Sequence, residues 1–91
     1  LPASDREALV SALSQIRDAI LAAEELQEMA GAELASIAED CTAELSAKAP
    51  NGFKLSALLS SVGQAVQTLG SVQPAYAALK VAALAVGVVL P

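Results

Sequence analysis

Charged residues divide this chain into two parts that differ in how well water can solvate them. All ten acidic residues precede position 45, and beyond Lys48 the only formally charged side chains are Lys54 and Lys80. The run from Val81 to Leu90 contains no polar side chain at all. Water is a poor solvent for such a run, so we expect neighbouring helices, a second subunit or a lipid bilayer to cover it.

The composition indicates an all-α fold. Hydrophobic residues make up 55% of the 91 residues and aromatic residues only 2%, so the core has to be built from alanine and aliphatic side chains. Alanine favours helices, and the residues that suit strands are scarce before the last segment. A chain of this length forms one domain. We expect a helical domain over 1–91, with an acidic amphipathic pair of helices over 1–49 and a nearly uncharged helical hairpin over 54–90.

The spacing of apolar residues predicts a compact four-helix bundle. The expected helices cover residues 5–30, 32–48, 54–69 and 74–90. A capping box formed by Ser4 and Glu7 marks the start of the first helix, because each side chain can pair with the backbone N–H of the other residue. Gly31 is the expected break between the first two helices, and one continuous kinked helix is the alternative.

Turn-forming residues set the other boundaries. Pro50 stops the second helix, and the pair Asn51-Gly52 tolerates the positive φ of a tight turn. Gly70 suits the position after the third helix, and Pro74 suits the first turn of the fourth. Because the fourth helix is apolar all round, we expect it to be the most buried element. The expected core consists of Leu9, Leu13, Ile16, Ile20, Leu34, Ile37, Cys41, Leu45, Leu58, Val62, Val66, Leu69, Leu79, Val81, Leu84, Val86 and Val88.

The residues that support common enzyme chemistry are missing. The chain has no histidine, so the most frequent general base and metal ligand is absent. It contains no Gly-rich phosphate loop, no Gly-x-Ser-x-Gly and no Ser-x-x-Lys. A net charge of −5 provides no basic patch for a phosphate backbone. We therefore expect a non-enzymatic protein without catalytic residues, metal or cofactor, and without a nucleic-acid partner.

Two sets of side chains could react or bind a cation, but each has a simpler explanation. Cys41 falls on the apolar stripe of its helix, which favours a small buried side chain over a reactive or dimer-linking thiol. The carboxylate pairs Glu24/Glu28 and Asp40/Glu44 are four residues apart and could form a weak cation site. A solvated acidic face is the better interpretation, because such carboxylates are almost always exposed.

An uncharged polar face on the third helix is a candidate contact with something other than bulk water. Aromatic and long basic side chains nearby would tolerate the headgroup region of a membrane. Phe53 could instead pack against the preceding loop, and Tyr76 could instead lie at the edge of the core. The candidate membrane or subunit contacts are Phe53, Lys54, Ser60, Gln64, Gln67, Ser71, Tyr76 and Lys80.

These patterns lead to one preferred function and two alternatives. The preferred function is a processed or secreted membrane-active polypeptide, toxin-like and pore-forming, that shields an apolar hairpin; processing is expected because the first residue is Leu1. The possible partners are a lipid membrane and further copies of the chain, and a soluble form is expected. One alternative is a self-associating structural or interaction module that uses the last two helices. The other is a carrier of an apolar ligand between alanine-rich helices.

Overall fold

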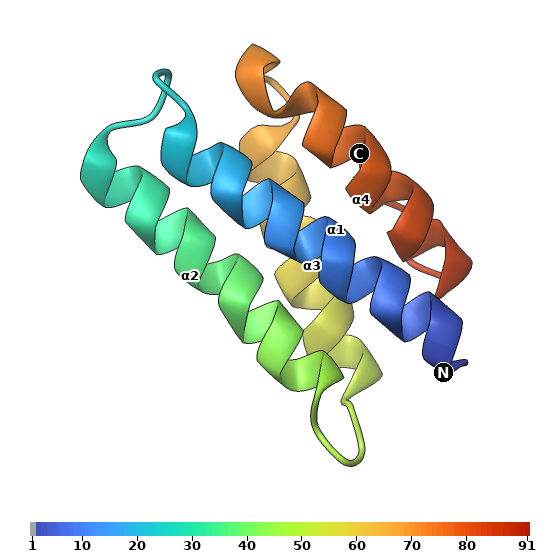
Figure 1. Ribbon diagram of the computed structural model, residues 1–91. Coiled ribbons are helices and arrows are strands. Elements are labelled where there is room, and N and C mark those ends of the chain that lie inside the picture. Colours follow the sequence, from blue (N-terminus) through green and yellow to red (C-terminus); the bar gives the residue numbers. More distant parts are fainter. Residues whose placement is uncertain (1) are drawn as a thin grey trace.

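Four helices make up most of the computed structural model, which describes residues 2–91. They are α1 (Ala3–Ala22), α2 (Glu28–Leu45), α3 (Gly52–Val66) and α4 (Gln73–Ala85), and a short 3-10 helix, η1 (Gly70–Val72), leads directly into α4 (Figure 1). The helices pack side by side into a bundle of 35 × 21 × 18 Å. The prediction of an all-α four-helix bundle is confirmed.

α1 is the central element of the bundle. It lies between α2 and α4 and packs along both, whereas α3 lies behind it and packs mainly on α2 (Figure 1). The predicted α1 stripe of Leu9, Leu13, Ile16 and Ile20 is completely buried. The other predicted core residues that are buried are Leu34, Cys41, Leu45, Val62, Val66 and Leu79, and those that are partly buried are Ile37, Leu58, Leu69, Val86 and Val88. Buried residues outside the prediction include Leu55, Leu59, Val72, Tyr76 and Leu90.

The prediction that the fourth helix is the most buried element is wrong. α4 packs along α1 on one side, where Leu79 and Ala83 are buried. Val81 and Leu84, which were both expected in the core, are 73% and 62% exposed. The reason is that a helix at the edge of a small bundle buries only one stripe, whatever the composition of its other faces.

The first two helices are separate, but the break falls before the expected position. The connection covers residues 23–27, beginning at Ala23 with extended backbone angles of φ −71° and ψ 120°. Gly31 is buried inside α2, where a Cβ atom would lie 3.6 Å from the Ile20 carbonyl oxygen of α1. The expected capping box is also absent, since α1 already includes Ser4 and the preceding residue, Pro2, provides no side-chain hydrogen bond.

Side-chain amides define both ends of α3. The helix begins at Gly52 because the Oδ1 atom of Asn51 accepts a hydrogen bond of 3.0 Å from the Lys54 backbone N–H. Asn51 is therefore a helix cap and has a negative φ of −84°, in contrast to the predicted tight turn. At the other end, the Gln73 amide nitrogen lies 3.0–3.1 Å from the carbonyl oxygens of Val66, Gln67 and Leu69. α3 thus ends before Gly70, which opens η1.

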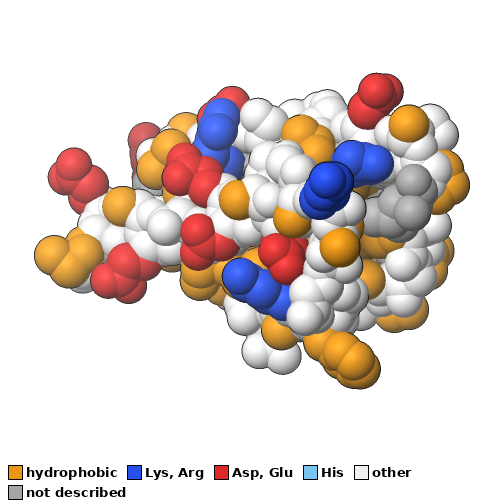
Figure 2. Space-filling model, turned by 90° about the horizontal axis from the view of Figure 1, so that it is seen from below, with side chains coloured by type: hydrophobic (Ala, Val, Ile, Leu, Met, Phe, Trp, Pro, Cys, Tyr) orange, Lys and Arg blue, Asp and Glu red, His pale blue; other side chains and the backbone are white. Residues whose placement is uncertain are grey.

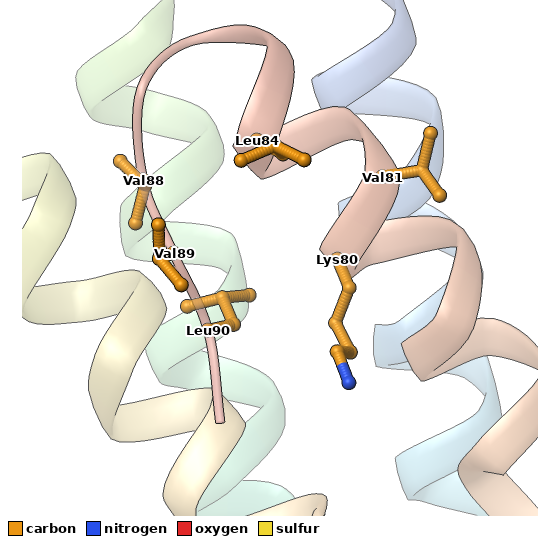
Figure 3. Close-up of a pocket in the computed structure, with 6 residues that line it drawn as sticks. All are labelled: Lys80, Val81, Leu84, Val88, Val89 and Leu90. Atoms are coloured by element: carbon orange, nitrogen blue, oxygen red, sulfur yellow. The ribbon is translucent and has the colours of Figure 1, made fainter.

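α4 begins as predicted, with Pro74 in its first turn, but it stops at Ala85. Gly87 follows with a φ of +87°, and the N–H groups of Gly87 and Val88 donate to the carbonyls of Leu84 (3.0 Å) and Ala83 (2.9 Å). These two bonds form a Schellman motif, the usual helix ending at a glycine with positive φ. The chain then reverses, and residues 86–91, here named the return segment, run back between α3 and α4 (Figure 3).

Candidate functional site

The candidate contact residues proposed from the sequence lie in different environments. Phe53 and Lys54 are exposed in the first turn of α3, and Lys80 is exposed on α4. Phe53 is 92% exposed, so the alternative that it packs against the preceding loop is wrong. Tyr76 is buried, and its hydroxyl donates to the carbonyl oxygen of Pro91. In this conformation the phenol ring therefore faces the protein interior and cannot contact a membrane.

The polar face of α3 is shorter than the sequence suggested. Ser60 is half-buried on α3, Gln64 is exposed, and Gln67 lies just beyond the helix. Ser71 is in η1, where its N–H donates to Glu25 Oε2 at 3.0 Å and its hydroxyl donates to Glu25 Oε1. These hydrogen bonds stabilise the carboxylate and lower the pKa of Glu25 below its usual value. Ser71 thus joins η1 to the α1–α2 connection.

Exposed apolar side chains gather where α4 meets the return segment. They form what we call the apolar edge, which consists of Phe53, Val81, Leu84, Val86, Val88 and Val89. Val89 is 80% exposed, whereas Val86 and Val88 are half-buried. Val88 connects the two sides of the edge, because it lines one groove with Phe53 and another with Val81 and Leu84.

The second of these grooves has a volume of about 190 Å³ and runs between α4 and the return segment (Figure 3). α4 contributes Lys80, Val81 and Leu84, and the return segment contributes Val88, Val89 and Leu90. Lys80 is the only charged lining residue, and its Nζ atom lies 5.5 Å from the centre of the Tyr76 ring. That distance suits a cation–π interaction.

Basic residues border the apolar edge. Arg6 and Lys48 line a groove of about 320 Å³ on the other side of Val86 and Val88. Lys54 follows Phe53, in a shallow groove that also contains Asp40 and Glu44. Figure 2 views the bundle from below and shows basic side chains among apolar ones, with most acidic side chains in the left half of the view. The fifth basic residue, Arg17, pairs with the neighbouring Asp18 at 3.1 Å.

The structure places the groups that the sequence named as possible reactive or cation-binding residues. Cys41 is completely buried, and burial together with the nearby Glu44 carboxylate raises the pKa of its thiol from 9.0 to about 12. Glu24 lies in the α1–α2 connection and Glu28 begins α2, so this pair does not share a helical face as expected. Between residues 2 and 91, no three acidic or cysteine side chains are grouped as metal ligands.

Sequence reasoning missed the return segment, which supplies half of the apolar edge. Gly87 was the available signal, because a glycine near the end of an apolar helical run suits the position after the helix. None of the helices described for residues 2–91 combines the length and hydropathy needed to cross a bilayer. No family model, curated protein or solved structure matches the chain significantly.

Proposed function

We propose that this protein is a non-enzymatic, membrane-active polypeptide that docks on lipid surfaces through the apolar edge. The observation that carries this proposal is the exposure of Phe53, Val81, Leu84 and Val89 around one end of the bundle, next to Lys54 and Lys80. Single exposed apolar residues are common on protein surfaces, but neighbouring ones with basic margins are typical of a membrane-contact site.

The magnitudes favour reversible docking. Full burial of one large apolar side chain contributes about 1.5–3 kcal/mol, so partial insertion of these four contributes about 4–8 kcal/mol in total. Each lysine near an anionic surface adds about 1 kcal/mol. The net charge of −5 acts against binding to anionic lipid at neutral pH. Binding should therefore strengthen as pH falls towards the isoelectric point near 4.4, where the net negative charge is lost.

Pore formation would require a rearrangement beyond docking. α4 covers Gln73–Ala85, which corresponds to about 20 Å at 1.5 Å per residue. The hydrocarbon core of a bilayer is about 30 Å thick. We therefore propose pore formation as a second step that follows docking, in which the apolar surface between α3 and α4 meets lipid. In this proposal the protein is a secreted, toxin-like pore former.

Vesicle co-sedimentation tests the docking step. The test variant is Phe53→Ser combined with Val89→Ser, and the matched control is Leu21→Ser combined with Met29→Ser, since Leu21 and Met29 are also exposed but lie away from the apolar edge. We expect the test variant to lose about tenfold or more in affinity for vesicles of phosphatidylglycerol and phosphatidylcholine, while the control binds normally. Equal affinities for both variants would contradict the proposed site.

A self-associating module is the second candidate, supported by a different surface. A shallow groove of about 490 Å³ between α1 and α4 is lined mainly by small side chains, including Ala8, Ala12, Ala78, Ala82 and Ala85. Small residues let another helix approach closely. Sedimentation equilibrium without lipid distinguishes the candidates, because a stable dimer that Ala78→Glu disrupts would favour the module.

A further inference from the structure

The seam between α3 and α4 is closed differently from the other seams of the bundle. α1 packs directly on α2 and on α4, and α2 packs directly on α3. α3 and α4 make little direct contact, and the return segment lies between them (Figure 3). A few residues of extended chain therefore close the seam in place of a helix–helix interface.

The α3 side of the seam is shaped to admit this segment. Gly63 is buried in α3, and a Cβ atom on it would lie 3.0 Å from the Tyr76 hydroxyl and 3.3 Å from Pro91 Cδ. Both distances are tighter than ordinary contacts, so any larger residue at this position would push against the Tyr76 hydroxyl of α4 and against Pro91 of the segment. Leu90 is buried next to the same glycine, with its Cδ2 atom 3.6 Å from that Cβ position.

Few interactions hold the segment beyond its turn. The Schellman motif fixes Val88, because its N–H donates to the Ala83 carbonyl. After Val88, and within the part of the chain that the structure describes, the hydrogen bond from Tyr76 to Pro91 is the only one that holds the segment. Leu90 is the only side chain after Val88 that is buried. Release of Val89, Leu90 and Pro91 thus breaks one hydrogen bond and exposes one leucine, together with the surface that it covers.

We propose that residues 89–91 are a latch on the α3–α4 seam, and that docking on lipid releases the latch so that acyl chains contact the apolar face beneath it. This inference rests on the proposed membrane docking and adds the step that follows it. The exposed face would include Gly63 on α3 and Tyr76 on α4, which lie against Leu90 and Pro91.

A bilayer would favour release for two physical reasons. In water, the latch stays closed because Leu90 and the seam would otherwise be hydrated, whereas acyl chains cover both equally well. Val89 and Lys80 also place the latch at the docking surface. An anionic headgroup that binds the Lys80 ammonium competes with the Tyr76 ring for the same charge, and so weakens the contacts around the latch.

Nuclear magnetic resonance tests the latch directly. In water we expect nuclear Overhauser contacts from the Leu90 methyl groups to Gly63 Hα and to the Tyr76 ring, since these groups lie together. In bicelles that contain phosphatidylglycerol, these contacts should disappear while contacts between Ile16 and the rest of the core persist. Persistence of the Leu90 contacts in the lipid-bound protein would overturn the inference and leave the proposed docking intact. Failure to bind bicelles at all would overturn both.

Two variants separate release of the latch from docking. Gly63→Val displaces the segment sterically, and Tyr76→Phe removes its hydrogen bond while keeping the aromatic ring. Gln64→Val, at an exposed position on the same helix, controls for a β-branched residue in α3. We expect either latch variant to release dye from vesicles about tenfold faster than the parent protein or the control, at equal amounts of bound protein. The latch would be refuted if Tyr76→Phe lost the Leu90 contacts already in water and still released dye at the parental rate. That result would refute the latch even if Gly63→Val fails to fold.

Discussion

Two glycines in this bundle should respond oppositely to the same substitution by alanine. Gly87 has a φ of +87°, and a Cβ atom there would have no neighbour within 4 Å. Gly31 is helical and buried, and its added Cβ would lie 3.6 Å from Ile20 O and 4.0 Å from Leu26 Cβ. Alanine at position 87 therefore meets only backbone strain, whereas alanine at position 31 meets only ordinary van der Waals contacts.

The expected magnitudes are large enough to measure. A non-glycine residue in the left-handed region costs about 1–2 kcal/mol, so Gly87→Ala should lower the free energy of unfolding by about that amount. Alanine exceeds glycine by about 1 kcal/mol in helix propensity, so Gly31→Ala should raise it by up to about 1 kcal/mol. The two variants should thus differ by about 1–3 kcal/mol. For a domain of this size, 1 kcal/mol corresponds to a shift of about 4–8 °C in Tm.

Urea unfolding followed by far-ultraviolet circular dichroism provides the assay, with thermal unfolding as an independent check. Equal m-values are needed so that the difference in midpoint reflects stability alone. If Gly87→Ala were as stable as the parent, the Schellman turn after α4 would be refuted, because that turn requires the left-handed conformation. If Gly31→Ala were less stable, α2 would have to approach Ile20 more closely than the structure shows.

Two further predictions concern ionisable groups. Cys41 should not react with a thiol reagent at about pH 8 until the protein is unfolded, and its raised pKa should make stability fall as pH rises from 9.0 towards about 12, since the unfolded thiol ionises first. Reaction of the native protein at the rate of a free thiol would contradict the burial of Cys41. The lowered pKa of Glu25 should contribute stability above about pH 4.5 that is lost as pH falls below it. Thermal unfolding between about pH 7 and pH 3 should therefore show a weaker pH dependence for Ser71→Ala than for the parent, and identical curves would refute the link between Glu25 and η1.

The sequence predicted the buried face of α1 well, although not its ends, because its pattern contains both kinds of information that a helix face needs. Apolar residues such as Leu13 and Ile16 recur on one side, and charged residues such as Arg17 and Asp18 mark the side that faces water. That contrast identifies a buried face before any partner is known. α4 lacks the contrast, since Lys80 is its only charged residue. Position in the bundle therefore decides which of its apolar side chains are buried, and the sequence alone could not exclude burial of Val81 and Leu84.

The α1–α2 break could not be located for a related reason. Residues 23–27 consist of good helix formers, Ala-Glu-Glu-Leu-Gln, whereas Gly31 has poor helix propensity. The connection is held by a contact that is distant in sequence, from Glu25 to Ser71, and the glycine is used for close packing between α1 and α2. Local propensity therefore pointed to the wrong position because tertiary contacts outweighed it.

The apolar run that ends the sequence is covered only in part, and this partial coverage supports a functional interpretation. Ala82 and Ala83 are buried in the bundle, and Leu90 is buried against Gly63. Val81, Leu84 and Val89 stay exposed beside one another, although the reversal at Gly87 brought the return segment back onto the protein. If this segment served only to fill the core, polar side chains at the three exposed positions would serve equally well, because the contacts of the buried residues would stay intact. Aliphatic side chains at these positions, next to Lys80, are instead expected of a surface that meets an apolar partner. The serine substitution at Val89 tests that explanation without disturbing the core.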